Sequence, residues 1–137
     1  MNKFLFLILL PGLLACATKT DRPADYTTGL TGTYTMTYMN WNGDVARMPE
    51  PGFAGSITLT KADYTHLGMV FSIRVRSGSE LVSQSSDAQL VELKPAGGAS
   101  FFLYDGAEKL GSVSPSAIAI NTTTETGAGV VTIKASR

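Results

Sequence analysis

Apolar and polar side chains alternate with a period of two residues along several stretches of the chain. In residues 32–38, Tyr34, Met36 and Tyr38 share one side and threonines occupy the other. Residues 68–76 place four apolar side chains at every second position, against serine and arginine. This period, together with many β-branched residues, predicts half-buried β-strands.

The same alternation recurs along the rest of the chain, and turn-forming residues separate its segments. Further strands are predicted at residues 44–48, 55–61, 80–83, 89–93, 100–105, 108–113, 117–122 and 130–134. Asn42-Gly43 is the strongest short signal for a β-hairpin. Short strands with turns about every ten residues predict an all-β fold, and short consecutive connections favour an antiparallel up-and-down barrel of about eight strands. A two-sheet β-sandwich uses the same alternation and is the alternative.

The N-terminal sixteen residues have a different pattern. A positively charged start precedes the unbroken apolar run 4–10. A cationic start, an apolar stretch of about 7–15 residues and a small residue at the cleavage site are typical of an export signal. The run is too short to cross a bilayer as a mature helix, which needs about 20 residues. Residues 1–15 are therefore predicted to be a signal peptide.

Leu13-Leu14-Ala15-Cys16 ends this segment, and the motif resembles the lipobox of bacterial lipoproteins. The resemblance implies that Cys16 carries acyl chains such as palmitate and becomes the first residue of the mature protein. Two or more chains hold a protein stably on a membrane, at about 0.8 kcal/mol per buried methylene. By the same resemblance, Ala17 favours the outer membrane. The expected location is the cell envelope, with the membrane as a partner through Cys16.

Composition separates a tether from a single domain. Residues 16–29 are rich in Thr, Asp, Pro and Ala and show no periodicity, so they are predicted to be a flexible tether. Residues 30–137 carry the alternation and are predicted to form one β-barrel domain.

Charge and residue counts exclude several kinds of function. The 137 residues include 11 Lys+Arg and 11 Asp+Glu, so the net charge is zero and the basic footprint that nucleic acid requires is absent. One Cys excludes an intramolecular disulfide and a cysteine-based zinc site. The single His leaves few routes to a metal site or to His-dependent catalysis. We therefore expect no cofactor, no metal and no catalytic residue.

The predicted domain opens with Gly32-Thr33-Tyr34. With its size and predicted export, it resembles the lipocalin-like (calycin) barrels, which include small bacterial lipoproteins. Members usually carry Trp at the place of Tyr34, whereas here Trp41 stands in the following turn. The resemblance implies a late arginine packed across the aromatic residue of the first strand, and Arg137 or Lys134 is the candidate.

An eight-stranded barrel is wide enough to be filled by its own side chains or to hold one small ligand. Inner tyrosines need hydrogen-bond partners, which water or a partly polar ligand supplies. We therefore expect a small, partly apolar molecule to bind inside the barrel without catalysis, oriented by the phenols. The predicted ligand-binding residues are Tyr34, Met36, Tyr38, Trp41, Phe71 and Ile73.

The alternative is a structural or protein-interaction lipoprotein with a solid β core. Phe102 and Tyr104 share one side of their strand, and an exposed aromatic patch marks a partner surface unless a loop such as 44–51 covers it. A third hypothesis is an enzyme that uses His66 beside Asp63. The chain lacks a Gly-x-Ser-x-Gly motif, so a surface histidine is the simpler interpretation.

Overall fold

The computed structural model describes residues 23–123 and 129–137. The predicted signal peptide, Cys16 and the first part of the predicted tether lie outside the described residues. Within those two ranges, no helix is long and apolar enough to span a membrane. The strands are β1 (Gly32–Trp41), β2 (Asp44–Arg47), β3 (Phe53–Lys61), β4 (His66–Ser77), β5 (Glu80–Ser85), β6 (Gln89–Gly97), β7 (Ser100–Asp105), β8 (Glu108–Val113), β9 (Ala117–Thr123) and β10 (Val130–Ser136).

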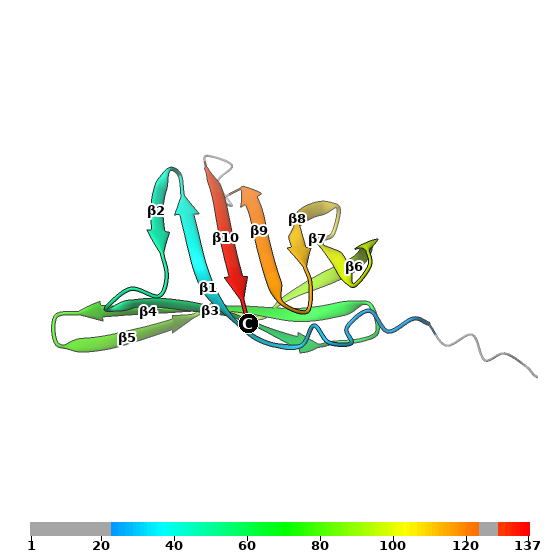
Figure 1. Ribbon diagram of the computed structural model, residues 1–137, viewed down its shortest axis with the longest axis horizontal. Helices are drawn as coiled ribbons and strands as arrows, with labels where there is room; N and C mark the ends of the chain where they lie inside the picture. The colour runs from blue at the N-terminus through cyan, green and yellow to red at the C-terminus, as the bar shows by residue number, and fades with distance from the viewer. Residues whose placement is uncertain (1–22, 124–128) are drawn as a thin grey trace, which may run out of the picture.

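The strands form one sheet that closes on itself. Neighbours pair antiparallel in the order β10-β9-β8-β7-β6-β4-β3-β1, and β10 also pairs with β1 (Figure 1). One side of β1 pairs first with β3 and then with β2, and one side of β4 pairs first with β6 and then with β5. The fold is therefore an eight-stranded up-and-down barrel, in which β2 occupies the same barrel position as β3, and β5 the same position as β6. The β10–β1 pairing confirms the predicted barrel and excludes the two-sheet sandwich.

The predicted hairpin turn joins β1 to β2. Asn42 and Gly43 have φ values of 55° and 101°. A two-residue type I′ turn needs positive φ at both central positions, which asparagine and glycine tolerate best. Trp41 and Asp44 pair across this turn, so Trp41 is the last residue of a strand.

A β-bulge interrupts β1 between Met36 and Tyr38. Before the bulge, Met36 pairs with the buried Ala135, and after it Tyr38 pairs with the exposed Lys134. Paired residues of antiparallel strands point to the same side, so the extra residue exchanges the inner and outer positions of β1. The prediction that Tyr38 shares the inner side with Tyr34 and Met36 is therefore wrong.

Inward-facing side chains from all eight barrel positions form one apolar core. The largest buried side chains are Tyr34, Leu30, Met36, Ile57, Leu59, Leu67, Met69, Leu93, Leu103, Ile118, Val91 and Val113. Among the described residues, no buried side-chain nitrogen or oxygen lacks a hydrogen-bond partner. The core is therefore apolar and its few polar atoms are satisfied.

The segment before β1 covers one end of the barrel, called the closed end below. Leu30 and Thr27 are buried in it, and the Tyr26 ring packs 5.2 Å from the ring of Phe101. The backbone N–H of Tyr26 also donates to the carbonyl oxygen of Tyr64. The packed domain thus begins before Leu30, earlier than the predicted tether boundary. The β1–β2, β4–β5 and β7–β8 turns lie at the opposite end, called the hairpin end.

Candidate functional site

Tyr34 lies at the closed end, and its side chain is fully buried. Its hydroxyl oxygen is 2.9 Å from the carbonyl oxygen of Leu30 and 3.1 Å from that of Ser114. Burial raises the pKa of the Tyr34 phenol above its ordinary value, so the group remains a neutral donor. The hydroxyl therefore joins the segment before β1 to the β8–β9 loop, and its donor capacity is already used.

Arg137, the last residue of the chain, lies over the Tyr34 ring, with its Cζ atom 4.5 Å from the ring centroid. Its guanidinium group donates hydrogen bonds to the carbonyl oxygens of Gly29, Thr31 and Pro115. Of the two candidates for packing across the first-strand aromatic residue, Arg137 is the one that takes this position. The interaction links the end of β10 to the segment before β1 and to the β8–β9 loop at the closed end.

Met36 lies further along the inner side of β1 and is also fully buried. A Cβ atom on Gly55 of the neighbouring strand would come within 2.4 Å of the Met36 Sδ atom. Met36 therefore occupies the space that this glycine leaves open. Tyr34 and Met36 both belong to the packed core and are not accessible from solvent.

Phe71 and Ile73 continue the inner side of β4 beyond the buried Met69, and both are partly exposed. β4 and β5 diverge here from β1, β2 and β10, as Figure 1 shows. Trp41 pairs with the buried Val131 and so also faces inward, yet its side chain is 52% exposed. Trp41 on β1 and Phe71 and Ile73 on the diverging β4 are called the apolar mouth below: they share an inward direction and partial exposure at the hairpin end.

Tyr38 lies on the outer side of β1. Its ring centroid is 5.5 Å from the Lys134 Nζ atom, and its hydroxyl accepts a hydrogen bond from Asn40 Nδ2 at 3.4 Å. Tyr38 is thus separated by its own strand from the other five predicted ligand-binding residues. A bulge has no local sequence signal here, since neither glycine nor proline lies between Met36 and Tyr38.

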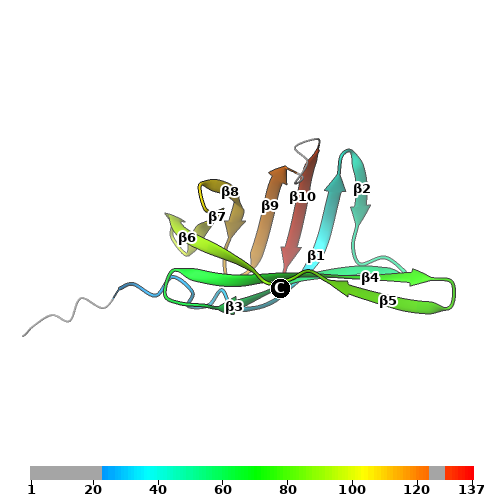
Figure 2. The ribbon, with the colours of Figure 1, turned by 180° about the vertical axis from the view of Figure 1, so that it is seen from behind.

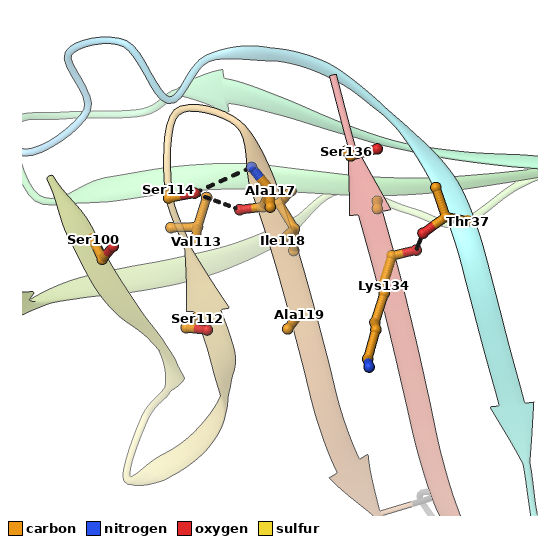
Figure 3. Close-up of a pocket in the computed structure, with 11 residues that line it drawn as sticks. Thr37, Ser100, Ser112, Val113, Ser114, Ala117, Ile118, Ala119, Lys134 and Ser136 are labelled. Carbon is orange, nitrogen blue, oxygen red and sulfur yellow. Dashed lines mark hydrogen bonds between the residues drawn. The ribbon is translucent and has the colours of Figure 1, made fainter.

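A hollow of about 340 Å³ lies on the outer side of β8, β9, β10 and β1 (Figure 3). Small side chains such as Ser112 and Ala119 line it, with Lys134 and Thr37 on the β10–β1 side. The Thr37 hydroxyl donates to the Lys134 carbonyl oxygen at 3.3 Å. Sequence reasoning missed this hollow, because small residues on an outer face become a depression only when β1 is placed beside the three C-terminal strands.

Two further hollows also lie on outer surfaces. One, of about 420 Å³, lies over Ser56, Ser72 and Arg74 on β3 and β4 and extends to β5. The other, of about 450 Å³, lies over Asn40 and Thr132 beside the β1–β2 turn. The first of these hollows also touches Ile73 of the apolar mouth, whereas the second contains none of its three residues.

Phe102 and Tyr104 lie on the outer side of β7, as the alternation predicts, and lysines cover them. The Lys109 Nζ atom is 3.4 Å from the Phe102 ring centroid, and the Lys94 Nζ atom is 4.3 Å from that of Tyr104. The alternative cover, loop 44–51, does not lie over these rings, because β2 pairs with β1 on another part of the barrel (Figure 1). Cation–π contacts of this kind leave the patch partly covered, and Lys94 also forms an ion pair with Glu92 at 3.3 Å.

Asp63 and His66 organise the β3–β4 loop. The Asp63 carboxylate accepts hydrogen bonds from the backbone N–H groups of Thr65 and His66, at 2.7 and 2.8 Å, and lies 2.9 Å from His66 Nδ1. The Thr65 backbone bond and the His66 side chain lower the pKa of Asp63 to about 2. Within the described ranges, no group of three or more His, Cys, Asp or Glu side chains is arranged to hold a metal ion.

No family model matches the chain, and no curated protein or solved structure is significantly similar to it. Function must therefore follow from the geometry of the described residues and from the signals in the sequence.

Proposed function

We propose that this protein is a lipid-anchored lipoprotein of the bacterial cell envelope, with a lipocalin-like barrel that binds a small, partly apolar molecule without catalysis. The observation that carries the proposal is the partial exposure of the inward-facing Trp41, Phe71 and Ile73. Inward apolar side chains are usually covered, and a concave apolar surface with polar edges is typical of a ligand site.

The sequence supports the anchor. Cys16 is the only cysteine and directly follows an apolar export signal. Nine residues lie between it and Tyr26, whose ring packs against Phe101 of the barrel. Even when fully extended, that length spans at most about 35 Å, so an anchored barrel stays close to the lipid surface.

The closed end supports the lipocalin-like character. Arg137 packs across Tyr34 of the first strand and bonds to carbonyl groups on both sides of it. This is the arrangement that the resemblance implies for a late arginine and a first-strand aromatic residue, with Tyr34 in the place of tryptophan.

The proposed binding is apolar contact at the mouth. A ligand buries its apolar part against Trp41, Phe71 and Ile73, with Met36 and Tyr34 beneath as a packed floor. Because the Tyr34 hydroxyl is already bonded to carbonyl groups, it does not orient the ligand. The polar part of the ligand remains toward solvent at the hairpin end.

Native mass spectrometry of the full chain purified from its host membranes tests this proposal. We expect a bound small molecule in the wild type, its loss in Ile73→Lys, and its retention in Ser72→Lys, which places the same charge on the opposite side of β4. Circular dichroism checks that both variants fold. The binding proposal is rejected if the wild type carries no adduct and octanoate leaves the emission of Trp41, the only tryptophan, unchanged.

The second candidate function is a structural or interaction lipoprotein with a solid core. The observation that favours it is that three hollows, together with the lysine-covered Phe102 and Tyr104, lie on outer surfaces of the barrel. Crosslinking from Lys109→Cys to a defined envelope protein, without any small-molecule adduct, would favour this function over the first.

A further inference from the structure

β5 pairs on only one side. It lies antiparallel to residues 72–77 of β4 and pairs with no other strand in the part of the chain that the structure describes. All of its residues are exposed. From both sides, the β4–β5 hairpin projects away from the barrel (Figures 1 and 2). Its outer edge presents backbone N–H and C=O groups that can template another strand.

β2 also pairs on one side, but it carries the usual protection of an edge strand. It has four residues, and Asp44 and Arg47 place charges at both of its ends. β5 has six residues, contains no proline or lysine, and has one charged residue, Glu80, next to its turn. Short length and charge are the common means of preventing edge pairing, so β5 lacks the protection that β2 has.

Exposed apolar side chains lie beside this unprotected edge. Val82 is 52% exposed and pairs with Val75 of β4, which is 43% exposed, on one face of the hairpin. Leu81, on the other face, is 55% exposed. A strand added at the edge of β5 would cover the flanks of Val82 and Leu81 and bond to the unpaired backbone groups.

We infer that β5 is a docking edge for a second copy of this chain, which adds its own β5 in antiparallel orientation about a two-fold axis. Identical antiparallel strands are self-complementary, so one patch serves on both copies. With the axis at Val82, Val82 lies opposite Val82 of the second copy, and Glu80 lies opposite Gln84 of the second copy. No like charges meet in this register, and two β-branched side chains are paired. With Glu80 as its single charged residue, the edge provides little charge complementarity for a strongly charged partner.

The oligomeric state of the full chain in detergent tests this inference, and analytical ultracentrifugation measures it. We expect wild-type dimers, loss of the dimer in Val82→Lys, and unchanged dimers in the matched control Val45→Lys, whose side chain is 55% exposed on β2. Equal thermal unfolding midpoints would show that both variants fold. A monomeric wild type, or a Val82→Lys variant that remains dimeric, would overturn the inference.

A cysteine placed on the same edge gives a second readout. On oxidation, Val82→Cys is expected to yield a covalent dimer of the chain, whereas Val45→Cys is not. A Val82→Cys chain that links only to a different protein would show that the edge serves another partner and would also overturn the inference. Neither result depends on whether the apolar mouth binds a ligand.

Discussion

The guanidinium group of Arg137 lies over the ring of Tyr34, 4.5 Å from its centroid, at the seam where the barrel closes. Tyr34 belongs to β1 and Arg137 directly follows β10, and the pairing of these two strands turns the sheet into a barrel. The same guanidinium group bonds to backbone carbonyls of the segment before β1 and of the β8–β9 loop. One side chain thus joins three segments at the closed end.

Replacing Arg137 should weaken this seam. We expect Arg137→Ala to lower the free energy of unfolding by about 1–3 kcal/mol, because several backbone carbonyls lose a charged donor and the Tyr34 ring loses its cation. Lys134→Ala removes an exposed cation on the outer side of β10. This control should change the free energy of unfolding by less than about 0.5 kcal/mol. Urea unfolding followed by circular dichroism measures both. Equal effects of the two substitutions would contradict the special role of Arg137.

Gly111 allows β8 and β9 to approach closely. A Cβ atom at this position would lie 2.0 Å from the carbonyl oxygen of Ala119. Because the obstacle is backbone, Gly111→Ala must displace a strand, and we expect it to lower the free energy of unfolding by at least about 2 kcal/mol. Ser112→Ala, on the next residue, is the control and should be nearly neutral. A thermal midpoint of Gly111→Ala equal to that of the wild type would disprove this packing argument.

Asp63 should make stability depend on acid pH. Its pKa in the folded protein is about 2, below the ordinary 3.8, because the backbone of Thr65 and the side chain of His66 donate hydrogen bonds to the charged carboxylate. The stabilisation is therefore present above about pH 4 and is lost as the pH falls toward 2. We expect Asp63→Asn to be less stable than the wild type at pH 6 and equally stable near pH 2.

Urea unfolding over this pH range checks that prediction. Asp87→Asn, on an exposed loop between β5 and β6, serves as the control. A stability difference between the wild type and Asp63→Asn that does not change between pH 6 and pH 2 would show that the Asp63 hydrogen bonds do not favour its ionised form.

Lipid attachment should depend on Cys16 and on its position. In cells fed labelled palmitate, we expect the wild type to incorporate the label and Cys16→Ser to incorporate none. The double variant Cys16→Ser, Thr18→Cys restores a thiol two residues later but does not restore the motif, so it should also remain unlabelled. Label in the double variant would indicate modification of any nearby thiol and would argue against a lipobox.

Much of the barrel could be predicted from local pattern. The alternation in residues 68–76 placed Phe71 and Ile73 on one side of a strand, and Asn42-Gly43 marked a hairpin, because side-chain direction and turn geometry depend on a few neighbouring residues. The site was predicted less well. Tyr38 was assigned to the inner side, since a bulge arises from pairing with β10 and leaves no trace in the sequence of β1 itself.

Local chain geometry was enough to foresee an all-β domain and which residues lie on the two sides of most strands, since a strand's alternation is built into its covalent structure. Only the tertiary structure decided four other features. These are the closure of the barrel by β10 and β1, the side to which residues of β1 point beyond the bulge, the hollow beside Lys134, and the uncovered edge of β5. Each of these features depends on which distant segments become neighbours, and that outcome is set by packing over the whole molecule.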